Sequence, residues 1–372
     1  MIYLDYQATT PLAPEAFAAM EPWLKDGFAN PHSAHAAGRA AAATVEVARD
    51  QVAALLPKGG RVIFTSGATE AINLAIMGCG LPVSAAATEH AAVLDSVHAL
   101  HGHILPVSET GNLSHPFATS AVERPIGESQ RRGVSTTLDT NGTSRLLAIM
   151  LVNNEIGNIQ PVAELAQAAH ASGGLFLCDA VQAYGRMPIP DGPDMIAISA
   201  HKIHGPKGIG ALWVRDGISL TPQMLGGGQE QGMRSGTLSP ALCAGFGAAA
   251  KLAAERMDVD ERHVAALWDR AVSAFADWTI NGSTSQRYKG NLNIRRDGVD
   301  AGRLISECRN IAFSAGSACA SGSGRTSHVL RALGLTDAQA KSSIRLGFGR
   351  YTTAQEIDMA TEAINCAAEA ML

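Results

Sequence analysis

Short, continuously apolar runs alternate with longer segments of helical periodicity through much of the chain. The runs at residues 145–152, 174–178 and 195–199 are typical of strands that are buried on both faces of a parallel sheet. Residues 162–171 lie between two of these runs and carry apolar side chains at helical spacing. This alternation predicts an α/β fold in which helices flank a mostly parallel sheet.

The same two periodicities predict further elements in the first part of the chain. Strands are expected at residues 2–4, 61–65, 83–87, 104–107 and 211–214, and helices at 14–24, 35–56, 91–100 and from residue 66 onward. Residues 112–145 are polar and only weakly periodic. We therefore expect that segment to be mostly loop, with at most one helix.

The last third of the chain has the pattern of a smaller α/β unit. Helices are expected at 240–255, 258–275, 300–308, 327–333 and 353–371, and strands at 291–295, 311–313 and 343–348. We divide the chain into a large domain, residues 15–254, and a small domain that combines residues 1–14 with 255–372. No internal repeat is visible in the sequence.

Polar residues follow the predicted strands at four separate places. In an open α/β sheet, ligands bind beyond the carboxyl ends of the strands, so these side chains are candidates for one site. The first lies at the start of a helix, where unpaired N–H groups suit a phosphate; ordinary capping by Ser66 or Thr69 is the plain alternative, and the two are compatible. The strand ends deliver Thr69, Asn154, Asp179, Gln182, Ser199, His201 and Lys202.

Lys202 is the most informative of these residues. It lies between a strand and a glycine-rich loop, where a lysine can form a Schiff base with a carbonyl; the plain alternative is an exposed turn with two lysines, Lys202 and Lys207. Asp179 ends the preceding strand, and a pyridoxal phosphate enzyme needs such a carboxylate at the pyridinium nitrogen. His90 stands at a strand-to-helix junction, where it has either a structural role or stacks on the cofactor ring.

Composition and charge narrow the class of protein. The 372 residues are 46% hydrophobic and 17% charged, with a net charge of −5, which leaves no basic footprint for nucleic acid. No apolar run reaches the length of a membrane span and the amino terminus lacks the pattern of a signal peptide, so we expect a cytoplasmic protein with no membrane partner. The six cysteines form no CxxC pair, which leaves a zinc or dithiol motif unsupported.

These segments together resemble the NifS/IscS-type cysteine desulfurases, which belong to the class V aminotransferase group and have the fold-type I pyridoxal phosphate architecture. The matching segments run in family order from near residue 5 to near residue 350. They are residues 5–11 (DYQATTP), 65–70 (TSGATE), 88–90 (TEH), 152–157 (VNNEIG), 179–182 (DAVQ), 199–210 (SAHKIHGPKGIG), 234–237 (RSGT), 317–319 (SAC) and 342–345 (SSIR).

The resemblance implies a pyridoxal phosphate cofactor and a set of residues that hold it. Thr237 resembles a threonine that reaches the phosphate from the neighbouring subunit, so a homodimer is implied. Arg345, with Asn154, would bind the carboxylate of the substrate L-cysteine. The implied cofactor site consists of Ala68, Thr69, His90, Asn154, Asp179, Gln182, Ser199, His201, Lys202 and Thr237.

Cys319 obtains its role from the same resemblance. It lies in a Gly/Ser-rich segment, residues 313–325, which we expect to be flexible and exposed. Its thiolate would take sulfur from L-cysteine as a persulfide and leave alanine, with Lys202 and His90 as the other catalytic residues. The sulfur would pass to an iron–sulfur scaffold or a sulfur-carrier protein. No resident metal is implied, and Cys319 is a candidate transient ligand of an iron–sulfur cluster.

The chain departs from the family at two places, which keeps alternatives open. The polar segment 112–145 replaces a more regular stretch, and the chain stops at Leu372 without the longer tail that helps some relatives to dock the iron–sulfur scaffold. A different sulfur acceptor therefore remains open. The alternative activities are a selenocysteine lyase or another class V aminotransferase-type enzyme, and the non-enzymatic alternative is an assembly subunit with this fold.

Overall fold

A seven-stranded sheet forms the centre of the computed structural model, which describes residues 1–113, 145–315 and 326–372. The strand order is β2-β8-β7-β6-β5-β3-β4, and of these strands only β8 runs against its neighbours. The mostly parallel sheet that the sequence predicted is thus confirmed. The strands are β2 (Gly60–Thr65), β3 (Val83–Ala86), β4 (His103–Leu105), β5 (Leu146–Met150), β6 (Leu175–Asp179), β7 (Met195–Ser199) and β8 (Gly210–Arg215).

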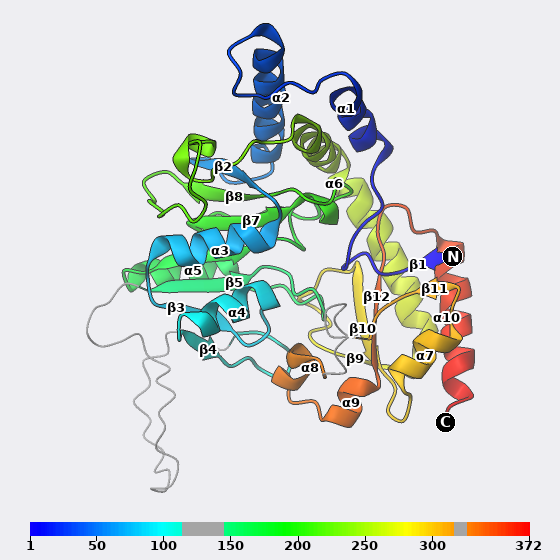
Figure 1. Ribbon diagram of the computed structural model, residues 1–372. Helices are drawn as coiled ribbons and strands as arrows, with labels where there is room; N and C mark the ends of the chain where they lie inside the picture. The colour runs from blue at the N-terminus through cyan, green and yellow to red at the C-terminus, as the bar shows by residue number, and fades with distance from the viewer. Residues whose placement is uncertain (114–144, 316–325) are drawn as a thin grey trace, which may run out of the picture.

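Helices cover both faces of this sheet, as Figure 1 shows. Alternate residues of β5 illustrate why: Leu147 and Ile149 belong to one hydrophobic core, while Leu146 and Ala148 belong to the core on the opposite face. The first core packs against α2 (Ala36–Ala53), α5 (Val162–Ala171) and the start of α6 (Pro240–Ala274), with the beginning of α1 (Pro14–Lys25) at its edge. The second packs against α3 (Ala68–Cys79) and α4 (Ala91–Ala99).

A smaller unit with its own core stands beside the large sheet. It contains a three-stranded antiparallel sheet in the order β12-β10-β9 and a two-stranded parallel pair of β1 and β11. The first residues of the chain therefore pair with a segment about 300 positions later. The strands are β1 (Ile2–Tyr3), β9 (Thr279–Ile280), β10 (Asn291–Arg295), β11 (Ile311–Ala312) and β12 (Ser343–Gly347), and the helices are α7 (Ala301–Glu307), α8 (His328–Ala332), α9 (Asp337–Lys341) and α10 (Ala354–Glu369).

The long helix α6 joins the two units. Two helices were predicted here, at 240–255 and 258–275, but the structure has one helix of 35 residues. That prediction was wrong because Arg256 and Met257, at the supposed break, are good helix formers and neither glycine nor proline interrupts them. Phe246 packs into the core of the large sheet and Trp268 into the core of the small unit. The domain boundary predicted at residue 254 falls inside this helix.

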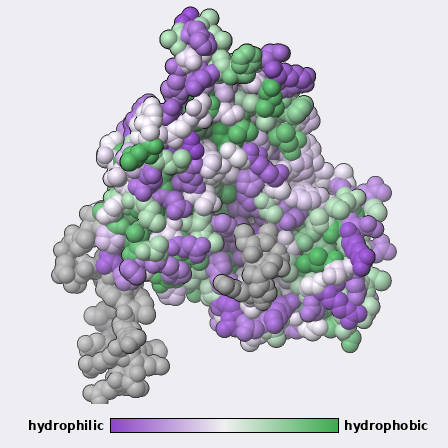
Figure 2. Space-filling model, viewed as in Figure 1, coloured by the Kyte–Doolittle hydropathy of each residue, from purple (hydrophilic) through white to green (hydrophobic). Residues whose placement is uncertain are grey.

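Two short elements, strand β9 and helix α9, were not predicted. At α9, Thr336 and Gln339 form a capping box, which is a recognisable signal for a helix start. The loop predicted at 112–145 lies largely outside the described residues. Large exposed apolar side chains occur on α1 and the loop after it, at Phe17, Leu24 and Phe28, and hydrophobic surface is visible over this part of the molecule in Figure 2.

Candidate active site

A cavity of about 830 Å³ opens at the carboxyl ends of β5, β6 and β7. This position is the one expected for a ligand site in an open α/β sheet. Thr237 is exposed and is not among the lining residues of its own chain, and Cys319 lies outside the described residues. The predicted site residues that line the cavity are Ala68, Thr69, His90, Asn154, Asp179, Gln182, Ser199, His201, Lys202 and Arg345.

Lys202 ends the single 3-10 turn that follows β7, which directs its side chain into the cavity. Its Nζ donates to the backbone carbonyl of Ala8 at 2.8 Å and also to that of Gln7. Burial, together with the positive charges of Arg186 and Arg345, lowers the pKa of Lys202 to about 7. The alternative interpretation, in which Lys202 lies in an exposed turn, is thus wrong, because its amine lies inside the protein. Lys207 is exposed at the rim of the cavity.

Asp179 is the last residue of β6 and lies beside Ala197 of β7 in the parallel register. Its Oδ1 accepts a hydrogen bond from the backbone N–H of Val181 at 3.0 Å. Burial raises the pKa of this carboxyl, and the nearby His90 and Lys202 oppose that rise. A cationic group bound in the cavity would stabilise the carboxylate further, which is the property that a pyridinium nitrogen requires.

His90 has the structural role that the sequence left open and also lines the cavity. It is the N-cap of α4, where its Nδ1 accepts the backbone N–H of Ala92 at 3.1 Å. Because Nδ1 is the acceptor, the proton of the neutral ring is on Nε2. Burial lowers the pKa of His90, so the residue is neutral at pH 7 and offers an N–H group. To accept a proton, it must first release the amide of Ala92.

The amino terminus of α3 lines one end of the cavity. The N-cap is Gly67, which has no side-chain cap, so ordinary capping by Ser66 or Thr69 is not what the structure contains. Gly210 pairs with Thr65 on one side and Ser199 on the other, which places Ser199 beside this helix start. Uncapped N–H groups and a hydroxyl fit a phosphate well.

His201 completes this end of the cavity as a neutral group. Burial, with the positive charges of Lys202 and Lys207, lowers the pKa of His201 to about 4. Its Nδ1 lies 3.2 Å from the hydroxyl of Thr9. His201 therefore contributes a hydrogen bond, and not a positive charge, to an anion at this position.

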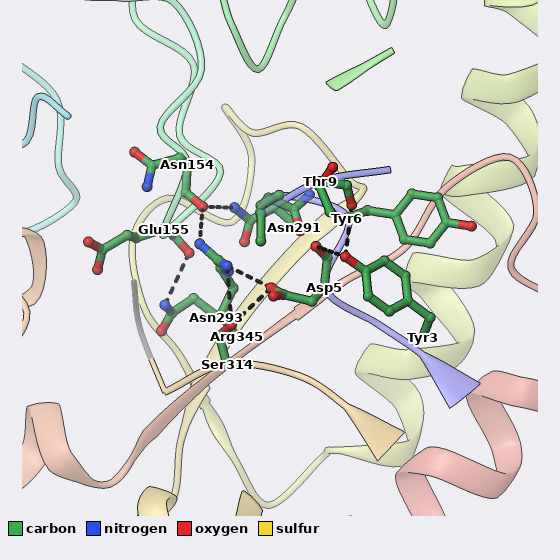
Figure 3. A network of polar contacts seen from close by, with 12 residues as sticks. Tyr3, Asp5, Tyr6, Thr9, Asn154, Glu155, Asn291, Asn293, Ser314 and Arg345 are labelled. Carbon is green, nitrogen blue, oxygen red and sulfur yellow. Dashed lines mark hydrogen bonds and ion pairs between the residues drawn. The ribbon is translucent and has the colours of Figure 1, made fainter. Parts of the chain in front are cut away.

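Arg345 is a buried residue of β12, not a surface arginine, which was the alternative considered from the sequence. Its guanidinium forms an ion pair with Asp5 at 2.7 Å and donates to the carbonyl of Asn154 at 3.0 Å, as Figure 3 shows. The hydroxyl of Ser314 donates to the same carboxylate oxygen of Asp5 at 2.9 Å. This network ties the amino-terminal segment, the small unit and the loop after β5 together at the cavity wall.

Several lining residues were not found by sequence reasoning. Gln7, Ala8 and Thr9 form part of the wall, and two of them act through backbone carbonyls, which no side-chain pattern reveals. The segment 5–11 was part of the family resemblance, but no role was assigned to it. The other lining residues without an assigned role include Glu155, Lys207, Gly208, Thr326 and His328.

The cavity holds the parts that pyridoxal phosphate requires. A lysine of lowered pKa and a buried carboxylate lie in one chamber with a helix start that has no side-chain cap. Together with the sheet topology, these features define a fold-type I pyridoxal phosphate enzyme. The chain belongs to the aminotransferase class-V family, whose model matches residues 2–359.

Similar proteins place the chain among the NifS/IscS-like cysteine desulfurases of that family. It is 40% identical to "Cysteine desulfurase IscS" of Rickettsia bellii, over 98% of this chain and 90% of the relative. The solved structure of a NifS-like protein from Rickettsia africae ESF-5 has a TM-score of 0.86 and 28% identity, with 99% of both chains covered. A structure of SspA in complex with cysteine has a TM-score of 0.78 and 30% identity, with 95% of this chain and 100% of that chain covered.

Two further findings concern the described residues only. Among residues 1–113, 145–315 and 326–372, no group of three or more His, Cys, Asp or Glu side chains could hold a metal ion. Within those same ranges, no helix has both the length and the apolar character needed to cross a membrane.

The low pKa of Lys202 predicts how the apoprotein reacts with an aldehyde. Only the neutral amine attacks a carbonyl, so the rate of reaction with pyridoxal phosphate is expected to rise with pH up to about 7 and to level off above it. An ordinary lysine would give a rate that still rises beyond pH 9. Stopped-flow absorbance measurements between pH 5 and 10 check this, and a rate that keeps rising to high pH would contradict the buried environment of Lys202.

Proposed function

We propose that this chain is a pyridoxal phosphate-dependent cysteine desulfurase, which converts L-cysteine to L-alanine and transfers the sulfur to Cys319 as a persulfide. The observation that carries the proposal is the single cavity in which Lys202 and Asp179 lie with Arg345. The first two residues provide the chemistry of a pyridoxal phosphate enzyme, and the third recognises an amino-acid carboxylate. The cysteine desulfurase names of relatives at 40% identity support the same activity.

The bound cofactor supplies an electron sink that weakens the bonds at the substrate α-carbon. Asp179 would hold the ring nitrogen of the cofactor, Asn154 and Gln182 would hold its phenolate oxygen, and the start of α3 with Ser199 would hold the phosphate. Lys202, whose pKa is lowered to about 7, can bind and release a proton at Nζ near neutral pH. It is therefore suited to carry protons between substrate carbons.

Arg345 is the proposed anchor for the substrate carboxylate. Its bonds to Asp5, Asn154 and Ser314 use three of the five guanidinium N–H groups. Of the remaining two, the Nε–H is buried, so the second N–H of Nη1 is the donor left for a carboxylate in the cavity. The ion pair with Asp5 also fixes the direction of the guanidinium, so little side-chain entropy is lost when the substrate binds.

Cys319 is the proposed sulfur acceptor within the chain. Described residues before and after Cys319 support this role, because Thr326 lines the cavity and Ser314 contacts Arg345 and its partner Asp5. In the transfer, the Cys319 thiolate forms a bond to the substrate sulfur as the carbon–sulfur bond breaks. The electron pair of the broken bond stays with the carbon, which then gains a proton and becomes the methyl group of alanine.

We also propose that the enzyme acts as a cytoplasmic homodimer and passes sulfur to an iron–sulfur scaffold or a sulfur carrier. Thr237 is exposed and lies outside the cavity lining of its own chain. This position is consistent with a contact between Thr237 and the active site of the second subunit. The exposed apolar residues Phe28 and Leu225 provide surface that a second subunit would cover.

A product assay tests the proposed activity. The holoenzyme with L-cysteine and a thiol reductant is expected to form alanine and sulfide in equal amounts. An aminotransferase would instead convert its cofactor to the pyridoxamine form and release no sulfide. A selenocysteine lyase would act on L-selenocysteine and leave L-cysteine unchanged. Either of these results would contradict the proposal.

A further inference from the structure

Arg186 lies immediately behind the wall of the active-site cavity. It follows Asp179 by seven residues and is not itself a lining residue. Its guanidinium donates to the backbone carbonyl of Lys202 at 2.7 Å and to Oε1 of Gln182 at 2.8 Å, and it lies 5.5 Å from the ring centre of Tyr288. Within the described residues it has no ion pair with a carboxylate. Arg186 therefore brings a positive charge close to the site without a counter-charge.

The contacts of Arg186 fix the orientation of one amide in the cavity wall. A guanidinium can only donate and a backbone carbonyl can only accept. The Gln182 amide lies between one donor and one acceptor. Its Oε1 accepts from the guanidinium of Arg186, and its Nε2 donates to the carbonyl of Gln7 at 2.9 Å. Turning the amide around would place two donors against each other and two acceptors against each other. The amide nitrogen of Gln182 thus has one hydrogen bonded to Gln7 and one hydrogen left for the cavity.

The second contact of Arg186 concerns the catalytic lysine directly. The backbone of Lys202 is held by the guanidinium, while its Nζ is held from the other side by the carbonyls of Gln7 and Ala8. After burial itself, the charge of Arg186 is the largest influence that lowers the pKa of Lys202. The same arginine therefore affects both the geometry and the protonation of the site.

We propose that Arg186 is a positioning residue for the cofactor site: it orients the Gln182 amide as a hydrogen-bond donor and keeps a fixed positive charge beside Lys202. A donor amide suits an oxygen anion such as the phenolate of the cofactor. The fixed charge disfavours the protonated state of the Lys202 nitrogen, including the nitrogen bonded to the cofactor. This inference rests on the pyridoxal phosphate chemistry proposed above.

A pH titration of the visible absorption of the holoenzyme tests this proposal. In Arg186→Met the fixed charge is lost, so the protonated nitrogen becomes more stable and the midpoint is expected to move upward by about one pH unit. Arg186→Gln, a second neutral variant, is expected to shift it in the same direction. Arg186→Lys keeps the charge and is expected to stay close to the wild-type midpoint. Neutral variants that titrate like the wild type would overturn the proposal.

A matched control separates this role from a merely structural one. Arg287 is also a buried arginine that donates to backbone carbonyls, at Ser283, Ile156 and Asn291, and it does not line the cavity. Arg287→Met is expected to lower the melting temperature without moving the titration midpoint. An equal shift in Arg287→Met would also overturn the proposal. A wild-type protein that lacks the absorption band would contradict the proposed function itself, so the two failures are distinguishable.

Discussion

Replacing Lys202 by alanine is expected to lower the formation of alanine and sulfide from L-cysteine by about 10³-fold or more. The change removes both the amine that bonds the cofactor and the group that carries protons at the substrate. The fold is expected to persist, because the backbone carbonyl of Lys202 still accepts from Arg186. Cofactor binding should weaken but not vanish, since Asp179 and the start of α3 remain in place.

The covalent bond to the cofactor provides a direct measurement for this variant. After borohydride reduction, intact-mass spectrometry should find the cofactor attached to the wild type and absent from Lys202→Ala. Lys207 is the matched control, because it also lines the cavity but is exposed at its rim. Lys207→Ala is expected to retain the covalent cofactor. A covalent cofactor that persists in Lys202→Ala and disappears in Lys207→Ala would show that the Schiff base forms at Lys207 and not at Lys202.

Replacing Cys319 by serine is expected to abolish sulfide release, with a loss of at least about 10³-fold. A hydroxyl is a poor nucleophile toward sulfur and cannot form the persulfide. The visible spectrum of the cofactor should remain, because the predicted cofactor contacts lie on other residues. The measurements are sulfide release and the mass of the protein after exposure to L-cysteine, which should increase by one sulfur atom in the wild type and not in Cys319→Ser.

The other cysteines supply the control for this second experiment. Cys178, Cys243 and Cys308 are buried, whereas Cys366 is exposed on α10 and does not line the cavity. Cys366→Ser is therefore expected to keep wild-type activity and wild-type persulfide formation. Full activity of Cys319→Ser, or loss of the added sulfur in Cys366→Ser, would exclude the proposed acceptor.

Local patterns in the sequence were sufficient to predict most strands of the large sheet. The ends of α5 and of β7 agree with the prediction to the residue, because each is a clean example of its periodicity. Asp179 and Lys202 could be paired in advance because consecutive parallel strands deliver their carboxyl ends to the same edge. The prediction failed at α6, where two helices were expected and the structure has one helix that passes from one core to the other.

The contacts between distant segments could not be predicted from the chain. Asp5 and Arg345 are separated by 340 positions, and nothing near either residue indicates its partner. The contacts of the Gln7 and Ala8 carbonyls with Lys202 cannot be predicted from the side chains, since every residue has the same backbone carbonyl. The sequence indicated where the chemistry lies, whereas the groups that orient it become visible only in three dimensions.

The pairing of β1 with β11 has a consequence for how the protein is made. Ile2 and Tyr3 are synthesised about 300 residues before their partners Ile311 and Ala312. At ordinary rates of translation, this interval is roughly 15 to 60 s. Asp5 waits longer still for its ion-pair partner Arg345, which lies 340 positions later. The part of the cavity wall that this ion pair holds can therefore form only after most of the small unit has been synthesised.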